Sequence, residues 1–246
     1  MIREYFAKTH QGPHLQLNED NYFVDLSNLI FGACDAFGGV NIGDKACNDL
    51  INHVKSNYTK IASDPDSTMP FFYNAKFLLE ANALINSIHQ SHLSLIKANR
   101  EQSFSKRAGV SGIFASLSND VLTTVSLGNL IMLFCHDNKL SIHIAPEVLS
   151  PNYFGHDQES VKKGMFSLNA IGLHEDLIFQ VKELKVAPGD KLYLLSDGIF
   201  PYLSFEEFND LITIKKQKSS DLVSELFDLA NQRGNHDNQT ALVVEF

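Results

Sequence analysis

The chain has 246 residues, of which 44% are hydrophobic and 20% are charged, and its formal net charge is −9. This composition is typical of a globular protein that is long enough to bury a sizeable core. The acidic balance argues against nucleic-acid binding, because contact with a phosphate backbone requires clustered Lys and Arg side chains.

The cellular location is predicted from the cysteines and from the lack of targeting signals. Cys34, Cys47 and Cys135 are odd in number and have no CxxC spacing, which argues against a disulfide framework and fits a reducing compartment. The first residues contain no apolar signal-peptide core, and no apolar run is long enough to span a bilayer. We therefore expect a cytoplasmic protein without membrane insertion, with specialised secretion into another cell left open.

The first half of the chain predicts a β-hairpin followed by two helices. Tyr22–Asp25 and Leu29–Asp35 are short apolar runs separated by three residues of turn type. Apolar residues recur at helical spacing from Ile42 to about Ile61, and again from about Tyr73 to Asn99. The polar segment Ser63–Ser67 separates the two predicted helices.

The second half predicts mostly strands. Four runs separated by tight-turn sequences indicate an antiparallel meander, at Gly112–Leu117, Leu122–Leu127, Leu130–Cys135 and Leu140–Ile144. Later strands are expected at Leu177–Leu184, Lys191–Leu195 and Gln239–Phe246, and helices at about Phe205–Ile212 and Ser220–Asn231. This order predicts an α+β sandwich of two antiparallel sheets with helices on their outer faces. No repeat or low-complexity linker divides the chain, so residues 1–246 are expected to form a single domain.

Four carboxylates stand at the ends of predicted strands. Asp35 and Asp197 each end an apolar run, Asp237 comes just before the last strand, and Glu19 comes just before the first hairpin. A sandwich gathers such strand ends at one rim, where carboxylates in one cleft repel one another and raise each other's pKa. They stay ionised together around multivalent cations, and oxygen ligands select Mg²⁺ or Mn²⁺ rather than zinc. The sequence therefore predicts a centre for hard metal ions.

Four short motifs follow one another along the chain: Asn18-Glu19-Asp20, Asp35-Ala36-Phe37-Gly38-Gly39, Ser196-Asp197-Gly198 and Asp237-Asn238-Gln239-Thr240. In order and spacing they resemble the successive signatures of the PPM family, the metal-dependent type-2C Ser/Thr protein phosphatases. Each motif is weak alone, but the ordered set is specific and covers nearly the whole chain. The resemblance implies a four-layer αββα sandwich with two Mg²⁺ or Mn²⁺ ions between the sheets.

The resemblance also implies roles for individual residues. Asp35 would bridge the two ions, with Asp197 and Asp237 on one ion and Glu19 on the other. The backbone carbonyl of Ala36 would complete the second ion site. A water held between two cations is deprotonated near neutral pH and is placed to attack phosphorus in line, so no protein nucleophile is needed.

Other positions would support these ligands or depart from the family pattern. Asp20 and Asn238 would lie just outside the ligands, in contact with them or with bound water. Many members carry an Arg for the substrate phosphate a few residues before the Glu-Asp pair, whereas here His14 is the nearest polar candidate. Phe37 stands where bacterial members usually have Met and eukaryotic members often have His, which favours the bacterial type. Asn129 occupies the place of an Asp that binds a third ion, and its neutral amide would bind a hard cation more weakly.

These features together predict a monomeric enzyme that hydrolyses phospho-Ser or phospho-Thr in a protein substrate. The alternative is a pseudophosphatase, which binds a phosphoprotein or another partner but turns over poorly. The missing Arg and Asn129 favour this alternative, and the four carboxylates favour the enzyme. The sequence carries no readable code for the substrate, and we expect its specificity to come from Pro146–Leu173 and Ser63–Pro70.

Overall fold

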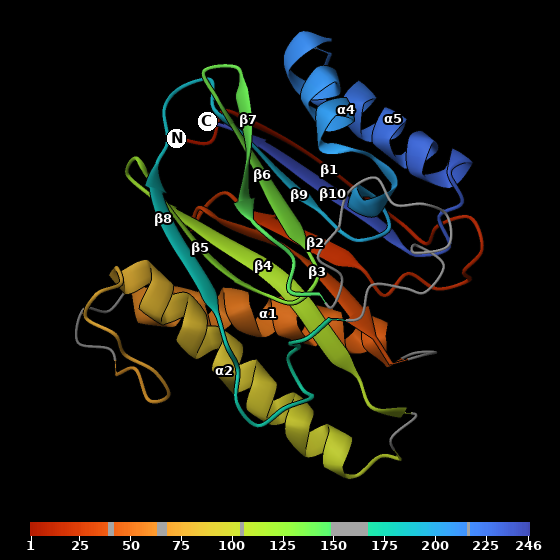
Figure 1. The fold of residues 1–246 in the computed structure, drawn as a ribbon. Coiled ribbons are helices and arrows are strands. Elements are labelled where there is room, and N and C mark those ends of the chain that lie inside the picture. The colour runs from red at the N-terminus through yellow and green to blue at the C-terminus, as the bar shows by residue number, and fades with distance from the viewer. Residues whose placement is uncertain (39–41, 63–67, 104–105, 149–166, 216) are drawn as a thin grey trace.

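Two antiparallel five-stranded sheets form the centre of the computed structural model, which describes residues 1–38, 42–62, 68–103, 106–148, 167–215 and 217–246. Sheet A has the strand order β1 (Glu4–His10), β10 (Gln239–Glu245), β9 (Lys191–Leu195), β6 (Ile131–His136) and β7 (Lys139–Ile144). Sheet B has the order β2 (Asn21–Asp25), β3 (Ile30–Phe37), β4 (Gly109–Ser118), β5 (Val121–Leu127) and β8 (Gln180–Lys185). The chain ends lie close together, because β1 pairs with β10 (Figure 1).

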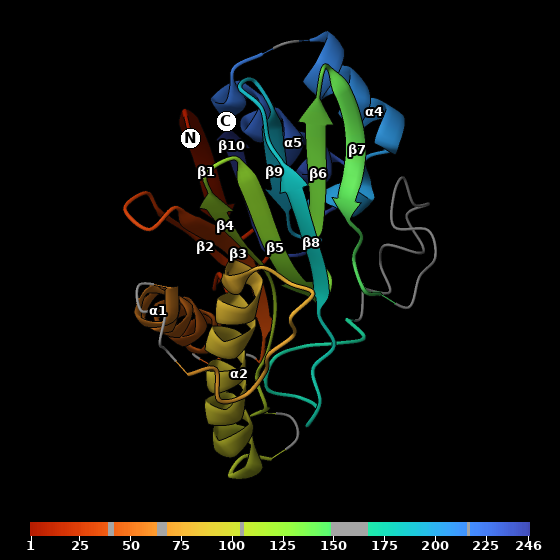
Figure 2. The same cartoon turned by 90° about the vertical axis from the view of Figure 1, so that its left-hand side faces the viewer.

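Helices cover the outer face of each sheet. α1 (Gly43–Ala62) and α2 (Leu79–Arg100) pack on sheet B, and α4 (Phe205–Asn209) and α5 (Ser219–Gln232) lie on the side of sheet A (Figure 1, Figure 2). The layers therefore run helix, sheet, sheet, helix. This arrangement confirms the predicted α+β fold and its αββα layering. No helix within the described ranges is long and apolar enough to cross a membrane.

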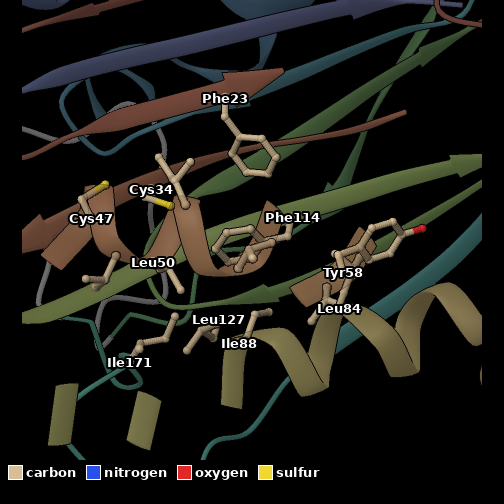
Figure 3. Close-up of a cluster of buried hydrophobic side chains, with 14 of the residues drawn as sticks. Phe23, Cys34, Cys47, Leu50, Tyr58, Leu84, Ile88, Phe114, Leu127 and Ile171 are labelled. Carbon is tan, nitrogen blue, oxygen red and sulfur yellow. The ribbon is translucent and has the colours of Figure 1, made fainter. Parts of the chain in front are cut away.

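Three apolar cores fill the spaces between these layers. The core between sheet B and its helices is shown in Figure 3, where Leu50 of α1 and Leu84 and Ile88 of α2 gather near Phe114 of β4. The middle core lies between the two sheets, and the third lies between sheet A and the helices that cover it. Burial of these side chains is the main favourable term in folding.

Strand β3 shows how the sequence divides its side chains between two cores. Ile30 and Cys34 face α1 and α2, whereas Phe31 and Ala33 face the other sheet. Because side chains alternate along a strand, Asp35 continues the face that looks toward sheet A. Asp35, the one acidic residue of this apolar strand, therefore faces the space between the sheets.

The predicted four-stranded meander is wrong at its centre. β4 and β5 belong to sheet B, but β6 and β7 belong to sheet A, so the chain crosses between the sheets at Gly128-Asn129. Gly128 has φ +94°, a conformation that favours glycine, and the crossing places Asn129 between the two layers. β8 and β9 likewise lie in different sheets, although the sequence places them in succession.

The second helix begins at Leu79 rather than near Tyr73. The residues before it are held as an irregular segment by two buried asparagines of α2. Asn86 Oδ1 accepts from the backbone N–H groups of Phe71 and Phe72, and Asn82 Oδ1 accepts from the N–H of Asn74. These bonds offer the backbone a partner that competes with helix formation.

Strand β1 was not predicted, because its sequence EYFAKTH mixes polar and apolar residues without a clear period. It is a half-exposed edge strand and gains its order by pairing with the apolar β10. The predicted first hairpin, first helix and last strand are confirmed within one or two residues. The predicted linker at Ser63–Ser67 lies outside the described residues.

Replacing Leu84 by Ala tests the core in Figure 3. Leu84 is fully buried, so Leu84→Ala should lower the free energy of unfolding by about 3 kcal/mol, measured by urea denaturation. Leu93 lies on the same helix but is 50% exposed, and Leu93→Ala should change it by less than about 0.5 kcal/mol. Equal effects of the two substitutions would contradict the packing described here.

Candidate metal centre

Carboxylates from both sheets meet at one rim of the sandwich. Asp35 lies near the end of β3 in sheet B, and Asp20 immediately precedes β2 in the same sheet. Asp197 follows β9 and Asp237 precedes β10, and these two strands are neighbours in sheet A. Asp237 lies close enough to raise the pKa of each of the other three, and Asp35 also raises the pKa of Asp20 and of Asp197.

The side-chain amide of Asn129 joins the two sheets at this rim. Its Nδ2 donates to Asp35 Oδ2 at 2.7 Å and to Asp197 Oδ2 at 2.8 Å. Asn129 is 6% exposed, so these bonds lie in a medium that strengthens them. The sequence predicted a site role for Asn129, but not this bridge, which depends on the crossing between sheets.

Asp20 is the most buried acid of the group, and Asp35 is half-buried beside it. The pKa of Asp35 is raised to about 7, chiefly by burial and then by the charge of Asp237, although hydrogen bonds with Asn129, Asp20 and Asp197 act in the opposite direction. Burial also raises the pKa of Asp20, and the charge of Asp35 adds to this effect. The two side chains are therefore costly to ionise together without a nearby cation.

Asp197 and Asp237 complete the group on the side of sheet A. The pKa of Asp197 is raised by burial first and then by Asp35 and Asp237. The pKa of Asp237 is raised chiefly by partial burial of its carboxyl group, and the N–H of Asn238 opposes this by donating to Asp237 Oδ1 at 2.8 Å. Asp237 keeps a solvent-exposed edge and forms the outer side of the site.

Glu19 lies beside this group rather than in its centre. A Cβ atom built on Gly43 would stand 2.1 Å from Glu19 Oε1, so the carboxylate rests on the first residue of α1. The positive end of the helix dipole favours a negative charge there. Asp20, which the resemblance puts outside the ligands, hydrogen bonds with Asp35 instead.

Asn238 fixes the loop that carries Glu19. Its Nδ2 donates to the carbonyls of Gln11 and Leu17, both at 2.9 Å, and its Oδ1 accepts from the N–H of Glu19 at 2.8 Å. Asn238 is buried, so it positions Glu19 and Asp237 relative to one another from the inside. Asn238 thus links the chain before β10 to the segment that carries Glu19.

Gly198 explains why an Asp-Gly pair ends β9. A Cβ atom at Gly198 would lie 1.8 Å from the carbonyl oxygen of Asn238, so a larger residue would push the chain after β9 away from the chain before β10. Asp197 and Asp237 belong to these two segments. The glycine therefore permits the close approach that brings both carboxylates to one site.

Three further residues of the site region have contacts of their own. His14 is exposed, and its ring lies 4.5 Å from the ring of His236, centroid to centroid. The Tyr202 hydroxyl accepts from the backbone of His236, and burial beside Asp197 and Asp237 raises the pKa of Tyr202 to about 12. Neither His236 nor Tyr202 was predicted as a site residue, because both lie outside the four motifs. Ala36 is buried, and its side chain faces the helices of sheet B.

The donor set of the rim fits hard cations by its chemistry. The buried acceptors Asp20 Oδ2 and Asn129 Oδ1 have no hydrogen-bond partner among the described residues, and a cation would satisfy such oxygens. Within the same part of the chain, no three His, Cys, Asp or Glu side chains already stand in a metal-ligand arrangement. Binding would thus require the carboxylates to rearrange around the ions.

Comparison with known proteins identifies the class of fold. No protein-family profile and no curated protein match the sequence. Among solved structures, PppA, a key regulatory component of T6SS in Pseudomonas aeruginosa, superposes with a TM-score of 0.77 at 20% identity, over 98% of this chain and 96% of that one. MsPP, a PPM Ser-Thr phosphatase from Mycobacterium smegmatis solved with cacodylate, gives a TM-score of 0.73 at 18% identity, over 100% and 99% of the two chains.

A third structure with this fold contains metal. The catalytic domain of the serine/threonine protein phosphatase PstP, in complex with two manganese ions, gives a TM-score of 0.72 at 18% identity, over 98% of this chain and 97% of that one. The chain therefore has the fold of the bacterial PPM-type Ser/Thr phosphatases. At the level of the fold, this confirms the resemblance that the four motifs indicate.

The bridge made by Asn129 can be tested in metal-free protein. Asn129→Ala removes the donor shared by Asp35 and Asp197, and should lower the free energy of unfolding in EDTA by about 2 kcal/mol. Asn28 serves as the control, because its amide donates to a single exposed carboxylate, that of Asp25. Asn28→Ala should cost no more than about 0.5 kcal/mol. An Asn129→Ala protein as stable as this control would show that the bridge contributes nothing.

Proposed function

We propose that residues 1–246 form a single, monomeric domain of the bacterial PPM type that hydrolyses phospho-Ser and phospho-Thr in a protein substrate. The observation that carries this proposal is the group of four mutually repelling carboxylates, Asp20, Asp35, Asp197 and Asp237, at the rim between the sheets. Such a group is costly for the fold unless cations bind there. The fold shared with metal-containing phosphatases supports the same conclusion.

The proposed ligands are those of the four motifs. Asp35 would contact both of two Mg²⁺ or Mn²⁺ ions, Asp197 and Asp237 would hold one ion, and Glu19 with the carbonyl of Ala36 would hold the other. Two such ions supply a bound water that is deprotonated near neutral pH. The residues of this chain then orient the reactants and exclude competing contacts, which is most of what phosphoryl transfer requires.

Residues around the carboxylates would serve the substrate rather than the ions. Asn129 donates to one oxygen of Asp35 and one of Asp197, so the other oxygen of each is available to an ion, and the amide would lie beside the substrate phosphate or serve as a weak third-ion contact. Asp20 and Asn238 would hold the ligands from behind. His14, with His236 beside it, is the proposed phosphate contact in place of the missing Arg. The Phe37 ring has no ionisable proton to donate, so the leaving group would be protonated by water or by His14.

A pseudophosphatase remains the second candidate, supported by one observation. The amide of Asn129 occupies an oxygen of both Asp35 and Asp197, so it competes with cations for two of the proposed ligands. A chain with weak ion affinity would bind a phosphoprotein or another partner without efficient turnover.

Hydrolysis of p-nitrophenyl phosphate separates the two candidates. With excess Mn²⁺ the wild type should hydrolyse it, and Asp35→Asn and Asp197→Asn should each lower kcat by about a hundredfold or more, because the ions lose a ligand. Asp228→Asn, an exposed Asp on α5, should retain wild-type activity. A wild type no faster than Asp35→Asn would refute the enzyme and leave the pseudophosphatase.

A further inference from the structure

A hollow of about 550 Å³ lies at the end of sheet B, and its lining includes Phe37 of β3. It is formed by the end of β3, the C-terminal turn of α2, the chain before β4 and the segment at 172–175, near the lower end of the molecule in Figure 1. Its volume is in the range of pockets that bind small molecules and side chains. The mechanism proposed above assigns no role to this hollow.

Phe37 connects the hollow with the metal centre. It follows Asp35 by two residues on the same face of β3, so their Cα atoms are separated by about 7 Å. Its ring lies on Gly109, where a Cβ atom would stand 2.2 Å from Phe37 Cζ. The ring thus forms a wall that faces the hollow, and it is 41% exposed.

The floor of the hollow is preformed by hydrogen bonds. The buried amide of Asn99 donates to the carbonyls of Ala108 at 2.7 Å and Gly172 at 2.8 Å, and its Oδ1 accepts from the N–H of Ala108 at 2.9 Å. His92 Nδ1 accepts from the N–H of Gly172 at 3.1 Å. These bonds join α2, the chain before β4 and the segment at 172–175 into one surface, so an occupant would meet a site that needs little ordering.

The charged side chains that line the hollow are mostly basic, in a chain whose net charge is −9. The lining includes the two arginines Arg100 and Arg107 and one carboxylate, that of Glu175. The ion pair between Arg100 Nη2 and Glu175 Oε1, at 3.2 Å, joins two side chains that are 69% and 85% exposed. Such a pair contributes little stability, so the Arg100 guanidinium can turn to another anion at low cost.

We propose that this hollow binds an acidic side chain of the phosphoprotein substrate, the carboxylate of an Asp or Glu two or three residues from the phosphorylated residue. An extended peptide advances about 3.3 Å per residue, so a side chain at that spacing spans the distance from Asp35 to beyond Phe37. Arg107 and Arg100 would bind the carboxylate, and Phe37 and Leu173 would pack against its methylene groups. This inference rests on the proposed function and names the substrate class for the same site.

The test compares phosphothreonine peptides that differ at one position. Two sets of peptides are used, one varied at the position two residues before the phosphothreonine and one at the position two residues after it. Within each set the varied position carries Glu, Ala or Lys. For the wild type, kcat/KM should be about fivefold higher for a Glu peptide than for the Ala peptide. Arg107→Ala should abolish this preference, and Arg107→Glu should reverse it in favour of the Lys peptide.

Two controls separate binding in the hollow from a structural effect. Hydrolysis of p-nitrophenyl phosphate, which has no peptide, should be unchanged in Arg107→Ala and Arg107→Glu. Lys97 lies in the last turn of α2, as Arg100 does, but it is exposed and does not line the hollow. Lys97→Ala therefore removes a nearby cation and should keep the wild-type preference. Equal kcat/KM for Glu and Ala peptides, a preference for an apolar residue, or an unaltered ratio in Arg107→Glu would overturn the proposal.

Failure of the proposed function would be recognised separately. If the wild type hydrolyses neither p-nitrophenyl phosphate nor any peptide, the proposed enzyme is wrong, and the hollow is then tested by fluorescence anisotropy with the same labelled peptides. The Glu peptide should still bind about fivefold more tightly than the Ala peptide, and Arg107→Glu should remove the difference. Equal affinities would reject the hollow as an acidic-residue site.

Discussion

Four carboxylates, Asp20, Asp35, Asp197 and Asp237, are crowded together at the rim where the two sheets meet. Burial raises the pKa of all four carboxyl groups, and the charge of a neighbouring carboxylate raises the pKa of Asp20, Asp35 and Asp197 further. In the protein alone, the amide of Asn129 supplies part of that compensation by donating to two of the carboxylates. The carboxylates are thus held by hydrogen bonds in the protein alone, and hard cations would favour a different arrangement of the same carboxylates.

The fold brings these carboxylates to one rim of the sandwich from distant parts of the chain. Sheet B contributes Asp35 at the end of an apolar strand, and sheet A contributes the acids that flank β9 and β10. Asn238 and Gly198 bring the connecting segments within van der Waals contact. The four layers thus act as a rigid frame around groups that would otherwise move apart, and preorganisation of this kind is what phosphoryl transfer requires from a protein.

Much of the frame could be predicted from the sequence, because the apolar runs before Asp35 and Asp197 are strong strand signals and the acids follow them directly. The crossing at Gly128-Asn129 could not be predicted, because the sequence of a tight turn does not show whether the chain returns to its own sheet or enters another. The bridge by Asn129, the contact of Glu19 with α1 and the irregular segment before α2 all depend on tertiary neighbours. Gly39 and most of the expected specificity segments lie outside the described residues.

The central claim is that the crowded carboxylates exist to hold two hard cations. Isothermal titration of the metal-free protein with Mn²⁺ tests this claim most directly, because it counts ions independently of any substrate. We expect two Mn²⁺ ions per chain for the wild type and the loss of at least one in Asp35→Asn, since Asp35 is the ligand proposed to contact both. A wild type that binds no Mn²⁺, or an Asp35→Asn protein that still binds two ions with unchanged affinity, would contradict it.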